Sequence, residues 1–176
     1  MRVLKVIVSL GLMAGFSMAL AEDFISANGV EVSVGKSQRF LESKLGIPDE
    51  ENKYFVAWTL ANGNRLAANF DEYGLSNASI SGEATTDYLS TDGVKIYLNK
   101  ESINDVAQKI TQGCYHEGWG NGKIAEYVVL SGPEGSYNLI FTAFGGEETA
   151  EQLKKLKITS ISLGDDNPFG EQVNCY

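Results

Sequence analysis

The chain contains two similar segments, and this internal repeat constrains the fold more than any other feature of the sequence. Residues 25–37 read ISANGVEVSVGKS, and residues 89–102 read LSTDGVKIYLNKES. In each segment an Asn-Gly or Asp-Gly pair is followed by apolar residues at every second position. Alternation with a period of two is typical of a half-buried strand, so we expect one strand in each copy.

A helical pattern follows each expected strand. In the second copy the apolar residues fall at i, i+3, i+4 and i+7, and Gly113 stands where a left-handed C-cap is favoured. In the first copy Gly46 and Pro48 end the pattern. The expected apolar stripes are Phe40, Leu41 and Leu45 in the first copy and Ile103, Val106, Ala107 and Ile110 in the second.

Three more strands, separated by turn signals, are expected after each helix. They are YFVAWTL, RLAANF and LSNASIS in the first copy and IAEYVVL, YNLIFTAF and LKITSISL in the second, which also has an insertion at residues 145–155. We therefore predict an α+β fold of two tandem repeats, each a strand, a helix and a three-stranded meander, with the helices packed on antiparallel sheet. The first repeat would cover residues 22–86 and the second residues 87–164.

The first 21 residues have the pattern of a secretory signal peptide. Arg2 and Lys5 precede a largely apolar run, and Ala19-Leu20-Ala21 forms a small-x-small cleavage site before acidic residues. The apolar run is too short for a comfortable membrane span, and no later run is longer. We therefore expect a periplasmic or secreted protein without membrane insertion.

Two cysteines, Cys114 and Cys175, remain after the signal peptide. In an oxidising compartment one disulfide is the simplest expectation. It would tie the turn-rich C-terminal tail, residues 165–176, to the body of the protein.

The formal net charge is −9, and it becomes more negative when the signal peptide is removed. An acidic chain disfavours nucleic acid and anionic membranes as partners, because both attract lysine and arginine. The charge suits a cationic partner, although solubility alone would also account for it.

The candidates for chemistry are weak. Cys114 and His116 could form a nucleophile and base pair, but an exported thiol with a second cysteine available is expected to be oxidised. One histidine is too few for a zinc or copper site, so we expect no metal and no cofactor. Two carboxylates acting as a glycosidase pair remain a minor alternative, since no pair stands out from solvated surface acids. We predict that the chain is not an enzyme.

The segment QGCYHEGWGNGKIAEYV, residues 112–128, combines several glycines with aromatic residues. We predict that Tyr115, His116 and Trp119 form a partner-binding loop, because tyrosine and tryptophan dominate protein interfaces. The alternative is a connection in which Trp119 folds back over the end of the helix.

The segment VSVGKSQRFLESKLGIPDE and the later turn-rich strands resemble the small domain of SmpA/OmlA-type outer-membrane assembly lipoproteins. The same helix and meander unit occurs in tandem in β-lactamase inhibitor proteins. The resemblance covers most of the first copy and part of the second, and it includes Gly35, Leu45-Gly46 and Pro48. The chain lacks a lipid-bearing cysteine, and it has too few cysteines for a disulfide in each repeat. The resemblance implies a module that binds proteins and catalyses nothing.

These observations together predict an exported, non-catalytic protein-binding module. It would be an inhibitor or immunity protein that neutralises a cationic enzyme such as a cell-wall hydrolase. The alternative is an envelope structural or assembly factor that binds outer-membrane proteins, and a minor alternative is an exported hydrolase.

Overall fold

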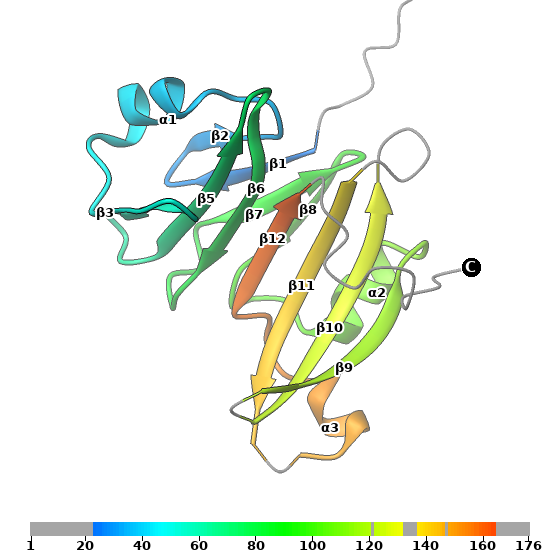
Figure 1. Ribbon diagram of the computed structural model, residues 1–176. Helices are drawn as coiled ribbons and strands as arrows, with labels where there is room; N and C mark the ends of the chain where they lie inside the picture. Colours follow the sequence, from blue (N-terminus) through cyan, green and yellow to red (C-terminus); the bar gives the residue numbers. More distant parts are fainter. Residues whose placement is uncertain (1–22, 121, 132–136, 147, 165–176) are drawn as a thin grey trace, which may run out of the picture.

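The computed structural model describes residues 23–164 except 121, 132–136 and 147. The described residues form an eight-stranded sheet and a four-stranded sheet, both antiparallel, with three short helices (Figure 1). The strands are β1 Phe24–Ala27, β2 Val30–Val32, β3 Glu50–Glu51, β4 Val56–Thr59, β5 Arg65–Asp71, β6 Gly74–Ser81, β7 Tyr88–Thr91, β8 Val94–Tyr97, β9 Cys114–Gly120, β10 Gly122–Ser131, β11 Tyr137–Gly145 and β12 Ser160–Gly164. The helices are α1 Gln38–Leu45, α2 Ile103–Lys109 and α3 Ala150–Leu153.

The four-stranded sheet consists of two hairpins in the order β2-β1-β7-β8. Each hairpin turns at the Asn-Gly or Asp-Gly pair of the sequence repeat, where both residues have positive φ: 50° and 81° at Asn28 and Gly29, and 46° and 78° at Asp92 and Gly93. Two consecutive residues of positive φ match the right-handed twist of the flanking strands. Each pair therefore lies within a hairpin, and β1 pairs with β7 to join the two hairpins.

The eight-stranded sheet has the order β3-β4-β5-β6-β12-β11-β10-β9. The two middle strands, β6 and β12, come from different halves of the chain and pair over five positions, from Ser81 opposite Ser160 to Asn77 opposite Gly164. The meander of each half is thus continued by that of the other, and they form one sheet.

The core lies between the two sheets. One face of the eight-stranded sheet contributes fully buried residues from β5, β6, β11 and β12, and the four-stranded sheet contributes residues from β1, β7 and β8. These buried side chains include Leu66, Ile80, Leu139, Phe141 and Ile161 on one sheet and Ile25, Leu89 and Ile96 on the other. Figure 1 shows the four-stranded sheet, α2 and α3 behind the large sheet.

Local capping explains where the two longer helices begin. The hydroxyl of Ser37 accepts a hydrogen bond from the backbone N–H of Phe40 at α1. Ser102 and Asp105 form a capping box at α2, and the hydrogen bonds from Ser102 lower the pKa of the Asp105 carboxyl. At the other end of α1 the indole Nε1 of Trp58 donates to the carbonyl oxygen of Gly46 at 2.9 Å. That bond fixes the end of α1 to strand β4.

A buried carboxylate connects the two sheets. Asp87, 1% exposed, precedes β7 and accepts at Oδ1 from the backbone N–H of Asn28 at 2.7 Å. Its Oδ2 accepts from the side-chain amides of Asn62 at 2.8 Å and Asn64 at 2.6 Å, both in the β4–β5 turn. The completely buried Asn64 also exchanges two hydrogen bonds with the backbone of Ala84. A turn of the small sheet is therefore joined to a turn of the large sheet by one negative charge.

The predicted α+β fold is wrong, because the described residues are mostly β with three short helices. Each half opens with a hairpin where the repeat predicted a single strand. The helices contribute little because α1 covers eight residues, α2 seven and α3, which lies in the insertion, only four. No disulfide joins two described residues: Cys114 is disulfide-bonded, and Cys175, its predicted partner, lies outside the described residues with the whole segment 165–176.

The predicted signal peptide, residues 1–21, also lies outside the described residues. Among the described residues, no helix has the length and apolar character needed to cross a membrane.

Candidate functional site

The segment predicted to be a partner-binding loop forms a β-hairpin at the edge of the large sheet. β9 pairs with β10 from Cys114 opposite Val128 to Gly120 opposite Gly122. Gly118, Gly120 and Gly122 therefore belong to strands, and the face on which each strand residue lies follows from the period of two. Tyr115 and Cys114 must point to opposite faces of the sheet.

Tyr115 lies opposite Tyr127, on the covered face of the sheet, and packs against the core. The ammonium of Lys154 lies 4.5 Å from the centroid of its ring. Burial raises the pKa of Tyr115 to about 12, and the nearby negative charges of Glu117 and Glu151 add to the shift. Tyr115 is therefore part of the core of the second half, on the covered face of the sheet.

His116 lies on the other face, opposite Glu126 of β10. Its Nδ1 is 3.2 Å from Oε2 of Glu126, and the two side chains are 38% and 17% exposed. Trp119 is opposite Lys123 in the strand register, and its side chain lies outside the described residues. The structure therefore separates Tyr115 from His116. In the described part of the chain no group of three or more His, Cys, Asp or Glu side chains could hold a metal ion.

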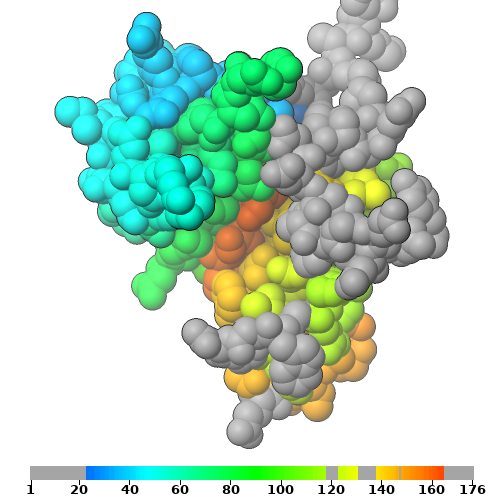
Figure 2. Space-filling model, viewed as in Figure 1, coloured from blue at the N-terminus to red at the C-terminus, as the bar shows by residue number. Residues whose placement is uncertain are grey.

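One face of the eight-stranded sheet is not covered by any described helix or strand, and we call it the open face. It is turned toward the viewer in Figures 1 and 2, where the orange-red surface of β12 lies next to the green surface of the first half. One row of paired residues crosses seven strands of this face: Thr59, Arg65, Ser81, Ser160, Thr142, Glu126 and His116. The next row consists of Ala57, Ala67, Ser79, Ser162, Ile140, Val128 and Cys114.

The middle of the open face consists of small side chains. Ser79, Ser81, Ser160 and Ser162 form two paired positions across the β6–β12 junction. Few charges lie on this face, and they are paired: Arg65 contacts Glu50 at 2.5 Å, and His116 contacts Glu126. Small side chains lose little rotamer freedom on contact, so this surface can be covered at low entropic cost.

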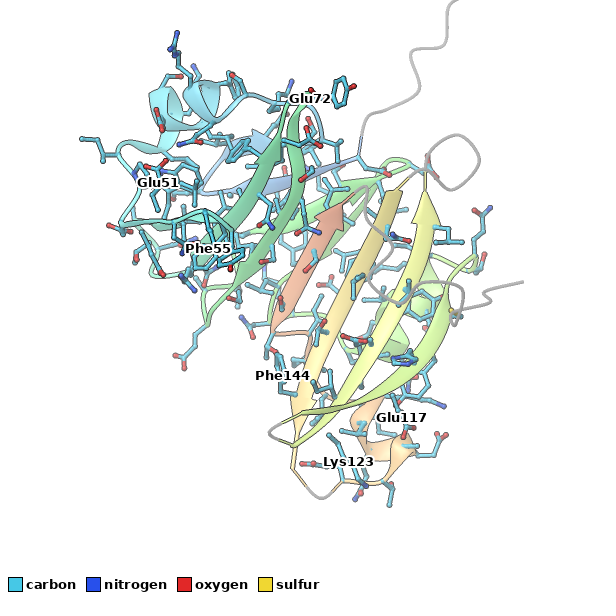
Figure 3. The ribbon with its side chains drawn as sticks, viewed as in Figure 1. Glu51, Phe55, Glu72, Glu117, Lys123 and Phe144 are labelled. Atoms are coloured by element: carbon cyan, nitrogen blue, oxygen red, sulfur yellow. The ribbon has the colours of Figure 1, made fainter. Side chains whose placement is uncertain are left out.

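An apolar pair borders the small residues at the second half of the open face. Ile124 of β10 lies opposite Phe144 of β11, and Phe144 is 59% exposed. Figure 3 shows Phe144 near the end of β11. Sequence reasoning missed these two residues. The signal was present in the two strands, because Ile140 and Phe144 alternate with Leu139, Phe141 and Ala143, so both faces of β11 are apolar.

The comparisons with known proteins do not identify a family. No family model matches the chain, and no curated protein matches it. Among solved structures, the chain is similar to an extracellular protein containing a SCP domain from Bacillus anthracis str. Ames, with 13% sequence identity and a TM-score of 0.46. The alignment covers 77% of this chain and 45% of that protein, so this chain spans less than half of its length. A similarity of this level carries no argument about function.

The comparisons give no support to the inhibitor-like tandem architecture. The resemblance to SmpA/OmlA-type lipoproteins stays a prediction.

Proposed function

We propose that this chain is an exported, non-catalytic module that binds a basic protein on the open face of its large sheet. The observation that carries the proposal is the exposed Phe144, opposite Ile124, on a sheet face that no described element covers. An aromatic side chain beside a low-entropy surface is typical of a binding anchor, because it buries a large area with few rotors.

The charge supports a basic partner. Most of the described lysine and arginine side chains lie against the chain's own aromatic rings or carboxylates, whereas the full chain keeps a net charge of −9. These cations are Lys36, Lys53, Arg65, Lys95, Lys100, Lys109 and Lys154. A surplus of acids speeds encounter with a positively charged protein and makes the association dependent on salt.

The test is capture of partners from the native envelope fraction on the immobilised mature chain. We expect a protein of basic isoelectric point to be retained at low salt and released as the salt concentration rises. Phe144→Ser should reduce its capture at least about tenfold without lowering the melting temperature, because the side chain is largely exposed. Ile47→Ser is the matched control, since Ile47 is 92% exposed but lies between α1 and β3.

Two outcomes would contradict this proposal. One is equal capture by the wild-type chain and Phe144→Ser, which would place the binding surface elsewhere. The other is retention of resident outer-membrane proteins without regard to their charge, which would favour the envelope assembly factor.

A further inference from the structure

A pocket of about 110 Å³ lies at the far edge of the large sheet, between the first turn of α1 and the β3–β4 hairpin. Its apolar lining comes from β4 and β5, at Val56, Ala68 and Phe70, together with Phe55 at the hairpin. Its polar lining consists of Gln38, Glu51, Asn52, Lys53 and the exposed Tyr54. Figure 3 shows Glu51 and Phe55 on this side of the molecule, far from Phe144.

Two carboxylates meet at one neutral amide beside this pocket. The side-chain nitrogen of Gln38 donates to Oε1 of Glu42 at 2.9 Å and to Oε1 of Glu51 at 3.2 Å. Both donors of the amide are used in this way, and the amide carries no charge to offset the two acids. The neighbouring Glu50 differs, because Arg65 pairs with it. Two like charges held this close favour binding of a cation between them.

One basic side chain, Lys53, already lines the pocket and lies over an aromatic ring. The ammonium of Lys53 lies 4.5 Å from the centroid of the Tyr54 ring. Lys53 therefore lowers the attraction of the pocket for another cation but does not form an ion pair with Glu42 or Glu51 within the described contacts. Replacing Lys53 by a neutral residue should therefore strengthen binding of a cation at the pocket, whereas replacing Glu51 should weaken it.

We propose that this pocket binds a lysine or arginine side chain of the basic partner, an inference that rests on the proposed function. A basic side chain matches the site in two ways. Its apolar stem suits the lining of Val56, Ala68 and Phe70. Its charged head suits the carboxylate of Glu51 in the lining and that of Glu42, which shares the Gln38 amide with it. An anion would be repelled by the carboxylates, and a purely apolar group would leave them uncompensated.

The test uses the peptide acetyl-Gly-Arg-Gly-amide and its citrulline counterpart, which has nearly the same shape without the charge. The peptides are titrated into the isotope-labelled mature chain and followed by amide chemical shifts. We expect the arginine peptide to shift the signals of Gln38, Glu51 and Asn52 with a dissociation constant of about 1 to 10 mM, and the citrulline peptide to leave them unchanged. The shifts should weaken at high salt.

Three charge-changing variants test whether peptide binding is electrostatic. Glu51→Gln should weaken binding of the arginine peptide at least about threefold, and Lys53→Gln should strengthen it about twofold. Glu83→Gln, which removes an exposed acid far along the chain, should have no effect. If Glu51→Gln disturbs the fold, Glu42→Gln removes the other carboxylate with the same expected loss.

Equal shifts with both peptides, no shifts at Gln38 and Glu51, or the same response in Glu51→Gln and Lys53→Gln would overturn the inference. Its failure is distinguishable from failure of the proposed function. Capture that depends on Phe144 but not on Glu51 would support the proposed function at the open face and contradict the inference about the pocket. Peptide binding at the pocket without Phe144-dependent capture would support the pocket and contradict binding at the open face.

Discussion

The carboxylate that joins the two sheets offers the sharpest test of the fold. Asp87→Ala removes the acceptor of three hydrogen bonds, from the backbone of Asn28 and the side chains of Asn62 and Asn64. A hydrogen bond to a charged group contributes about 1.5 to 3 kcal/mol, but Asn62 and Asn64 each keep a second acceptor and Asn28 is near solvent. We therefore expect a loss of about 3 to 5 kcal/mol in the free energy of unfolding.

Urea unfolding followed by circular dichroism measures this loss, and a fall of roughly 10 °C in the melting temperature should accompany it. Glu83→Ala is the matched control, because it removes an exposed acid four residues earlier and should change stability by less than about 0.5 kcal/mol. A loss below about 1 kcal/mol for Asp87→Ala would refute the reasoning. It would show that water or neighbouring groups replace the carboxylate as acceptor.

Three further predictions concern the packing of the second half and the turn between β5 and β6. Tyr127→Phe should cost about 1 to 2 kcal/mol by urea unfolding, because its buried hydroxyl donates to a backbone carbonyl and accepts from a backbone N–H; an unchanged midpoint would contradict this. Gly74→Ala should destabilise strongly, since its φ is 118° and a Cβ would lie 2.5 Å from the carbonyl oxygen of Gly35; a wild-type melting temperature would show that the turn can shift. Burial raises the pKa values of Tyr115 and Tyr127. The contribution of these two tyrosines to the free energy of unfolding should therefore be fully present below pH 10 and fall as the pH rises above 10, because the tyrosines of the unfolded chain ionise first. Tyrosine absorbance and unfolding measured from pH 9 to 12 check this, and no loss of stability above pH 10 would argue against the burial.

The features that the sequence determines are local, although we predicted a single strand where each half opens with a hairpin. The Asn28-Gly29 and Asp92-Gly93 pairs mark turns because few other residues accept a positive φ. The helices begin after Ser37 and Ser102 because a serine side chain satisfies a backbone N–H of the first turn. The period of two then predicts most of the long strands.

The candidate site was harder to predict. His116 and Tyr115 are neighbours in the sequence, but a strand sends them to opposite faces, and the glycines around them concealed that strand. Phe144 was missed because β11 is apolar on both faces, so its sequence does not say which face the core covers. The pocket beside Gln38 depends on side chains from α1, β3, β4 and β5 that meet only in the folded chain.

The sequence by itself determined the turns, the helix starts and the alternation of the strands, since each depends on residues within one turn or one strand. Only the tertiary structure decided that β6 pairs with β12, that β1 pairs with β7 and that no described helix or strand covers one face of the large sheet. It also decided that the carboxyl of Asp87 is buried among amide donors. The physical reason is that backbone N–H and C=O groups pair equally well with any strand of matching register. The choice among strands therefore rests on burial of apolar faces contributed by distant parts of the chain.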